Sequence, residues 1–122
     1  MVRLFCVLIL VVSTYSAAQS AVEKAHGPDC SGGWPTKMAF ALLKNAGLVD
    51  NSSIDFSQTR TLRLASEKTG KDLWHQVYQV TFIKNSGDAL ETIVVHDASV
   101  EECSMSGVEV FVVSKHLNPE RK

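Results

Sequence analysis

Two cysteines constrain this chain of 122 residues most strongly, because a bond between them would join segments that are far apart in the sequence. Cys30 and Cys103 remain after the predicted removal of residues 1–18, which carry the third cysteine, Cys6. In an oxidising compartment an isolated pair most simply forms a disulfide, and two free buried thiols are the alternative. A bridge closing a loop of about seventy residues stabilises a fold by roughly 4 kcal/mol in the chain-entropy model.

The N-terminal segment, residues 1–18, has the three parts of a cleavable signal peptide. Arg3 supplies a positive charge, residues 4–12 form an unbroken apolar run, and small residues follow. Cleavage is predicted before Gln19, with a cut after Ala21 as the alternative. The apolar run spans only roughly 14 Å as a helix, about half of a hydrocarbon core, so a membrane anchor is not expected. The mature protein is predicted to be soluble and periplasmic or secreted.

A single small domain is predicted to follow the signal peptide. Removal of residues 1–18 from the 122 leaves 104 residues, enough for one modest core over residues 19–122. Residues 19–29 and 118–122 are polar and aperiodic and are predicted to be flexible. Without Arg3 the 12 basic residues become 11, against 13 acidic ones. This weak acidic excess argues against a protein that binds nucleic acid.

The hydrophobic periodicity predicts one helix followed by four strands. Residues 35–46 carry apolar side chains at spacings of three and four, with Pro35 suited to the first turn and Gly47 to the position after the last. Strands are predicted at residues 59–67, 73–84, 90–96 and 108–114, with a loop at 97–107. Short connections favour antiparallel pairing in sequential order. The predicted fold is α+β, one helix packed on a four-stranded antiparallel meander sheet with one disulfide.

The predicted sheet carries apolar residues on both faces, although one helix can cover only one of them. Within residues 73–84 an aromatic face carries Trp74, Tyr78, Val80 and Phe82, and the opposite face carries Leu73 and Val77. We therefore expect the second face to be covered by long loops, by a partner protein or by a second copy of the chain.

No sequence motif for catalysis, cofactor binding or metal binding stands out. His96 and Asp97 are neighbours on a predicted strand, so their side chains would point to opposite faces and could not form a relay. His75 and His96 could lie on paired strands, but a third metal ligand at suitable spacing is missing. Neither an enzyme nor a cofactor or metal site is predicted.

The predicted loop at residues 97–107 is the strongest candidate for binding a partner. Asp97, Glu101 and Glu102 concentrate negative charge before the cysteine of this loop, and Met105 follows it. A loop tethered by a disulfide loses little entropy on binding, so it would suit a basic or polar cleft. The alternative is a solvent-exposed connecting loop whose cysteine only stabilises the fold.

The two tryptophans are predicted to have different roles. Trp74, at the start of the longest strand, is predicted to be an interface anchor. Trp34 lies close to Cys30 in the sequence and is predicted to pack on the disulfide.

Two family resemblances bear on function. Residues 76–80 (QVYQV) resemble the Q-x-V-x-G loop of the cystatins, but Val80 stands where the glycine would be and the segment lies within a predicted strand. Inhibition of cysteine proteases is therefore not predicted. In size, export and single disulfide the chain resembles the small periplasmic immunity proteins and lysozyme-type inhibitors of Gram-negative bacteria.

The second resemblance implies a non-enzymatic protein that blocks a secreted cell-wall hydrolase, acting as an antibacterial toxin, by stoichiometric occlusion. One alternative is a small-ligand-binding domain with a cavity lined by Trp74, Tyr78 and Phe82. Another is a structural envelope protein that assembles with itself as a homodimer.

Overall fold

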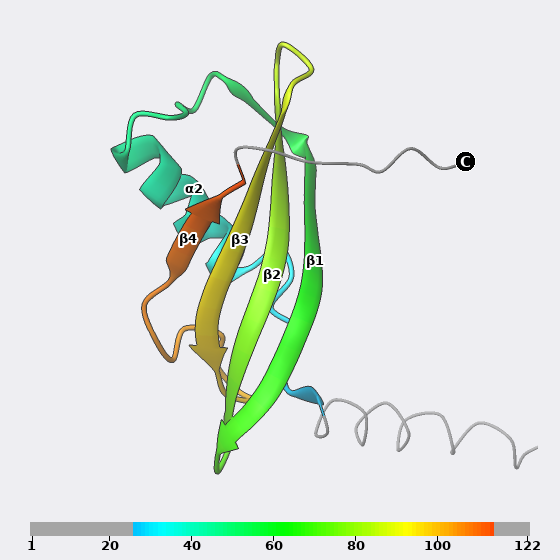
Figure 1. The fold of residues 1–122 in the computed structure, drawn as a ribbon, viewed down its shortest axis with the longest axis vertical. Helices are drawn as coiled ribbons and strands as arrows, with labels where there is room; N and C mark the ends of the chain where they lie inside the picture. The colour runs from blue at the N-terminus through cyan, green and yellow to red at the C-terminus, as the bar shows by residue number, and fades with distance from the viewer. Residues whose placement is uncertain (1–25, 114–122) are drawn as a thin grey trace, which may run out of the picture.

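The computed structural model describes residues 26–113 of the chain, which form one helix and one sheet. The elements are helix α2 (Trp34–Asn45) and strands β1 (Ile54–Gly70), β2 (Leu73–Lys84), β3 (Ala89–Ala98) and β4 (Glu109–Val112). The strands pair antiparallel in the order β1-β2-β3-β4, and the helix lies on one side of the sheet (Figure 1). The predicted α+β fold is confirmed. The predicted signal peptide and the predicted flexible tail, residues 118–122, lie outside the described residues.

Helix α2 packs on the sheet through residues spaced four apart. Pro35, Ala39 and Leu43 are its buried residues, and Pro35 lies in the first turn as predicted. Leu42 is one of the apolar residues at spacings of three and four that predicted the helix, but it is 38% exposed. The helix contacts β2, β3 and β4. The helix reaches the edge strand β1 through a hydrogen bond between the Thr36 and Thr61 hydroxyls at 3.0 Å.

The helix ends as the sequence predicts. Gly47 has a positive φ of 75°, which L-residues with a side chain rarely adopt. Its amide donates to the Lys44 carbonyl, and the Leu48 amide donates to the Leu43 carbonyl. These two bonds are the Schellman pattern, which satisfies carbonyls that the helix leaves unpaired.

Strand β1 is longer and less regular than predicted. It begins at Ile54 instead of residue 59, because the residues between Asp55 and Arg60 keep strand conformation while leaving the register with β2. A second irregularity leaves Leu64 without a paired residue on β2. Such bulges break the alternation from which a strand is recognised in a sequence. Strand β3 is longer than the predicted 90–96, and β4 is shorter than the predicted 108–114.

The core lies between helix α2 and the face of the sheet formed by the even-numbered residues of β2 and β3. These buried residues are Trp74, Gln76, Tyr78, Val80 and Phe82 on β2, and Thr92, Val94, His96 and Ala98 on β3. The predicted aromatic face of β2 is therefore the core face. Gln76, Thr92 and His96 are polar and Tyr78 adds a hydroxyl, so the core also has to satisfy their hydrogen bonds.

The segment before the helix is held on the sheet by buried polar side chains. The Tyr78 hydroxyl accepts a hydrogen bond from the Cys30 amide at 2.9 Å and donates one to Gln76 Oε1 at 3.0 Å. Gln76 Nε2 and Arg63 Nη1 both donate to the Pro28 carbonyl, at 2.8 and 2.9 Å. Residues 26–29 of the segment predicted to be flexible are therefore bonded to the sheet, because their backbone supplies partners that the side chains need, and residues 19–25 lie outside the described residues.

This segment also explains why Trp74 is buried. Gly27 has a φ of 73°, and a Cβ on it would lie only 2.6 Å from Trp74 Cγ. The backbone of Gly27 therefore packs directly on the indole ring, which is 2% exposed. Trp34, in contrast, is 36% exposed. The predicted role of Trp74 as an interface anchor is thus wrong, because Trp74 is a core residue and presents no surface to a partner.

We expect Gly27→Ala to lower the free energy of unfolding by about 2 kcal/mol or more, because it adds a steric clash to a strained backbone. The control is Gly32→Ala, which has a similar φ of 70° but no atom within 4 Å of the added Cβ. Urea unfolding of the oxidised protein measures both. Equal destabilisation by the two substitutions would show that Gly27 does not pack on Trp74.

Candidate functional site

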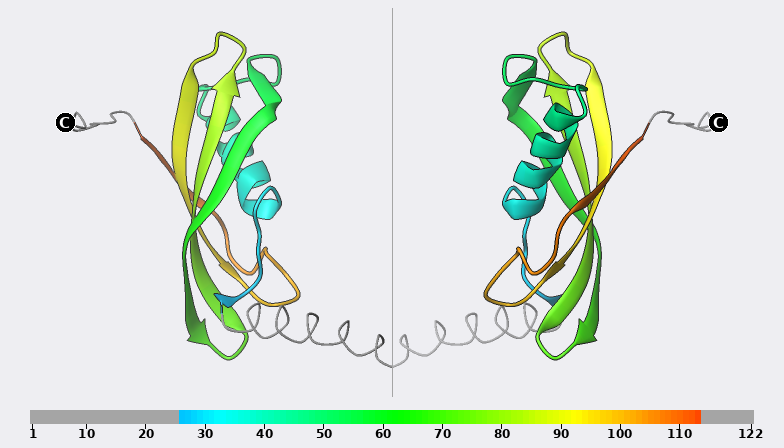
Figure 2. Two further views of the ribbon diagram at one scale, coloured as in Figure 1. Left: turned by 90° about the vertical axis from the view of Figure 1, so that its right-hand side faces the viewer. Right: turned by 90° about the vertical axis from the view of Figure 1, so that its left-hand side faces the viewer.

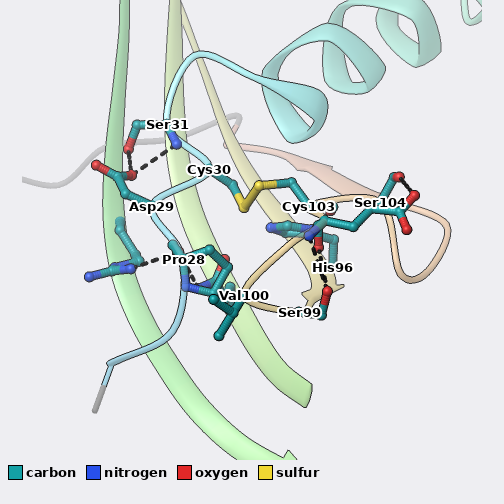
Figure 3. Close-up of a disulfide and its surroundings, with 12 residues drawn as sticks. Pro28, Asp29, Cys30, Ser31, His96, Ser99, Val100, Cys103 and Ser104 are labelled. Carbon is teal, nitrogen blue, oxygen red and sulfur yellow. Dashed lines mark hydrogen bonds between the residues drawn. A yellow bond between two sulfur atoms is a disulfide. The ribbon is translucent and has the colours of Figure 1, made fainter. Parts of the chain in front are cut away.

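The candidate site is the loop at residues 99–107, which follows β3 and is called the anchored loop below. Its Cys103 forms a disulfide with Cys30, with an S–S distance of 2.06 Å across a sequence separation of 73 residues (Figure 3). Beside the bridge, Asp29 Oδ1 accepts hydrogen bonds from the amide and hydroxyl of Ser31, and these bonds lower the pKa of Asp29. The predicted disulfide is confirmed, and it fixes the loop to the segment that enters the helix.

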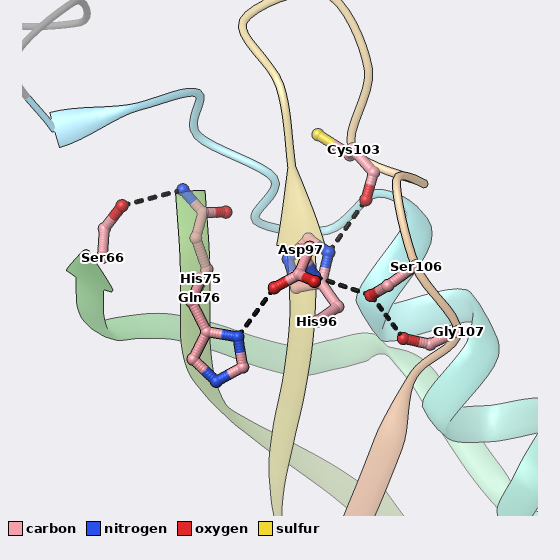
Figure 4. A network of polar contacts seen from close by, with 8 residues as sticks. All are labelled: Ser66, His75, Gln76, His96, Asp97, Cys103, Ser106 and Gly107. Atoms are coloured by element: carbon pink, nitrogen blue, oxygen red, sulfur yellow. Dashed lines mark hydrogen bonds and ion pairs between the residues drawn. The ribbon is translucent and has the colours of Figure 1, made fainter. Parts of the chain in front are cut away.

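Hydrogen bonds to the end of strand β3 fix the anchored loop against the sheet. His96 Nδ1 donates to the Cys103 carbonyl at 2.8 Å, and the Asp97 amide donates to Ser106 Oγ at 2.8 Å (Figure 4). The Met105 amide donates to the Asp97 carbonyl at 3.1 Å. The loop is therefore bonded to the last residues of β3 at three of its positions.

A further hydrogen bond comes from the turn between β1 and β2. Asp72 Oδ1 accepts the amide of Val100 at 2.9 Å. Asp72 has a positive φ of 54°, a conformation that Asp tolerates better than most residues. The sequence predicts a short connection between these strands, but it gives no sign that an aspartate in this connection would form a hydrogen bond to another loop.

The anchored loop exposes a small amphipathic surface. Val100 is 49% exposed and Met105 47%, and the side chains of Glu101 and Glu102 are exposed as well. The structure therefore brings together three of the predicted partner-binding residues, Glu101, Glu102 and Met105. Val100 was not among the predicted residues, because nothing in the sequence distinguishes an exposed valine from a buried one.

Asp97 lies apart from this surface, on the sheet face that is opposite to the helix. Its Oδ1 is 2.7 Å from Nδ1 of His75 on the neighbouring strand (Figure 4). His75 and Asp97 are directly paired across β2 and β3, whereas His96 is paired with Gln76 and points into the core. The two histidines that the sequence could have placed together are thus on opposite faces of the sheet.

His96 is the buried ionisable group behind the anchored loop. It is 1% exposed, and its Nε2 has no hydrogen-bond partner among the described residues. Burial lowers the pKa of His96 below its ordinary value of 6.5, although the hydrogen bond to the Cys103 carbonyl opposes this effect. His96 therefore supports the loop in its neutral form, with the proton on Nδ1.

A pocket opens between the start of helix α2 and strand β1. Its volume is about 390 Å³. Phe40, Phe56 and Phe82 supply apolar walls, and the other lining residues are Gly32, Thr36, Lys37, Thr59 and Thr61. The cavity predicted from the sequence was to be lined by Trp74, Tyr78 and Phe82, and of these only Phe82 lines this pocket. Trp74 and Tyr78 are instead packed in the core.

Residues 26–113 contain neither a cluster of metal ligands nor a membrane-spanning helix. No cluster of three or more His, Cys, Asp or Glu side chains that could hold a metal ion is present in this range. None of the helices in the same range is long and apolar enough to cross a membrane. Comparisons with protein-family models, with curated proteins and with solved structures gave no match. The geometry of the site is therefore the basis for the proposed function.

We expect acid to destabilise the protein through His96. Because its pKa is lowered in the folded state, the unfolded chain binds the proton more readily. The free energy of unfolding should therefore fall as the pH decreases from about 6.5 toward the lowered pKa, and the full stability should be present above 6.5. Urea unfolding at pH 7.5, 6.5 and 5.5 measures this dependence.

His96→Asn is the test variant, because its amide can still donate to the Cys103 carbonyl but does not titrate. We expect it to flatten the pH dependence in this range. His26→Asn is the control, since His26 is exposed. If His96→Asn kept the native slope, His96 would not be the group that links stability to pH.

Proposed function

We propose that this protein is an exported, non-enzymatic inhibitor that blocks a secreted cell-wall hydrolase by inserting the anchored loop into the cleft of the enzyme. The observation that carries the proposal is the combination of rigidity and exposure in this loop. The disulfide and the bonds from His96, Asp97 and Asp72 fix its backbone, yet Val100 and Met105 stand in solvent. A surface that is already ordered loses little entropy when it binds.

The charge of the loop favours an enzyme that acts on an anionic polymer. Cell walls carry many carboxylates, so a cleft that binds them gains from basic side chains. Glu101 and Glu102 present two adjacent negative charges to such a cleft, and Val100 and Met105 flank them with apolar surface. This arrangement of charge beside apolar anchors is typical of binding surfaces between proteins.

The disulfide, the predicted export and the small size of the protein support this proposal. A disulfide is compatible with an oxidising compartment outside the cytoplasm, and the signal peptide predicted at residues 1–18 would deliver the chain there. The resemblance in size, export and disulfide to periplasmic immunity proteins and lysozyme-type inhibitors points to the same class of target.

The proposal is tested by capture followed by titration. Immobilised oxidised protein is expected to retain a cell-wall hydrolase from native periplasmic and extracellular extracts at a ratio close to one to one. The purified enzyme should then lose its activity on labelled peptidoglycan when about one equivalent of the protein is added.

We expect Glu101→Lys to weaken this inhibition by about tenfold or more, because it places a positive charge against a basic cleft.

Two further variants separate the loop from the rest of the surface. Asp88→Lys makes the same charge reversal in the hairpin between β2 and β3, at the other end of the sheet, and should inhibit like the native protein. Asp72→Gly removes the acceptor that holds the Val100 amide but tolerates the positive φ, so it should weaken inhibition without changing any exposed side chain of the loop. Retention of no hydrolase, or full inhibition by Glu101→Lys, would contradict the proposal.

A second candidate function is the binding of a small amphipathic molecule in the pocket between α2 and β1. Three phenylalanine rings form its apolar part, and the Phe40 and Phe56 rings meet edge to face at 4.9 Å. Lys37 and the threonine hydroxyls provide polar contacts, and Thr59 Oγ1 is buried without a partner among the described residues. A ligand with an aromatic or acyl body and an anionic head would match this lining.

The fluorescent probe 1-anilinonaphthalene-8-sulfonate, which has an aromatic body and an anionic group, tests this second function. We expect Phe56→Ala and Lys37→Ala each to weaken its binding by about fivefold or more. Phe111→Ala, on the opposite side of the sheet, is the control for binding to exposed apolar surface. A signal that depends on Phe111 and not on Lys37 would eliminate the pocket as the binding site.

A further inference from the structure

The face of the sheet opposite the helix carries an apolar patch that is left uncovered by the described residues. Helix α2, the segment before it and the anchored loop all lie on the other side of the sheet (Figure 2). This side of the sheet is called the open face below, and its central residues are Leu62, Ala65, Val77, Gln79, Ile93, Val95 and Phe111. Leu62 is 59% exposed and Phe111 56%. A contiguous apolar surface of this kind marks an interaction site in soluble proteins.

The open face is organised in rows that run across the strands. One row contains Leu62, Gln79, Ile93 and Phe111, and the next contains Ala65, Val77, Val95 and Glu109. A third row, toward the end of the sheet that carries the anchored loop, contains Glu67, His75 and Asp97. Six of the eight residues in the first two rows are apolar, and the charged residues lie at the rim.

We infer that the open face is the interface of a homodimer, in which two copies pack sheet on sheet about a two-fold axis parallel to the strands. Such an axis places each row on the same row of the partner and brings β1 over β4. Leu62 then faces Phe111 of the other copy, and the central residues of the two sheets meet. Packed sheets keep their strands within about 30° of each other and lie about 10 Å apart, which suits this arrangement.

The charges at the rim select this axis over the alternative. With the axis parallel to the strands, His75 lies over Asp97 of the other copy, so the two His75–Asp97 pairs form one alternating cluster. With an axis perpendicular to the strands, the first two rows exchange places, the third row no longer meets the third row of the other copy, and this cluster does not form.

The size of the open face fits a small dimer interface. Three strands about 4.8 Å apart over roughly 20 Å of their length, with the four residues of β4 beside them, give a flat area of about 350 Å². Protruding side chains increase the accessible area toward the roughly 600–1,000 Å² per partner that specific interfaces bury. We therefore expect a reversible dimer, whose affinity is not set by the area alone.

A second copy explains the open face better than the C-terminal segment of the same chain does. Residues 114–122 (SKHLNPERK) contain one large aliphatic residue, Leu117, among charged and polar ones. A segment with this composition cannot bury the six apolar residues of the open face. A dimer does, because each copy supplies the same apolar rows to the other.

Sedimentation equilibrium of the oxidised full-length mature protein between about 1 and 300 µM tests the inference. The native protein should dimerise, and Leu62→Lys and Phe111→Asp should each raise the dissociation constant by about 100-fold. Mixing these two variants should restore dimers, because the introduced lysine of one copy faces the introduced aspartate of the other. Leu48→Lys changes another exposed leucine, 50% exposed and outside the open face, and should dimerise like the native protein.

Three outcomes would overturn the inference. The native protein could remain monomeric at 300 µM, the two open-face variants could dimerise normally, or mixing them could fail to restore dimers. Both residues are exposed, and circular dichroism with urea unfolding checks that each variant remains folded. Inhibition by the anchored loop does not depend on this face, so Phe111→Asp should still inhibit the hydrolase, and the two proposals succeed or fail separately.

Discussion

The fold depends on the way in which Tyr78 and Gln76 hold the chain that enters helix α2. Both side chains are fully buried, so each needs hydrogen-bond partners inside the protein. The Cys30 amide and the Pro28 carbonyl provide these partners, with Ser66 Oγ as a third. An unsatisfied buried amide or hydroxyl costs about 1–3 kcal/mol, so the polar groups and the segment stabilise each other. The core is therefore complete only when residues 26–30 are in place.

The anchored loop depends on the same segment. Because Cys30 is fixed by Tyr78, the disulfide attaches Cys103 to a rigid point and not to a loose end of the chain. His96 fixes the other side of Cys103 through its carbonyl. A core made of apolar residues alone could hold the helix, but it would offer no acceptor or donor to this loop. The buried polar residues thus connect the stability of the core to the surface that we propose for binding.

The two faces of the sheet serve different purposes in this picture. One face carries the core, the helix and the anchored loop, and its side chains are buried within the chain itself. The other face ends in Leu62 and Phe111, which keep more than half of their surface exposed in a single copy. Binding of a hydrolase at the end of the molecule and dimerisation through its open face would use separate surfaces. Both could therefore occur at once.

The sequence by itself determined the features that depend on local pattern. Periodicity located helix α2 and its end at Gly47, alternation separated the two faces of β2, and an isolated pair of cysteines after a predicted signal peptide predicted the disulfide. Tertiary structure decided whatever depends on which segments meet. The register of β2 and β3 pairs His75 with Asp97, and the crossing of Gly27 buries Trp74 while Trp34 stays exposed. Neither contact has a local signal, because each joins residues whose distance in space is set by the whole fold.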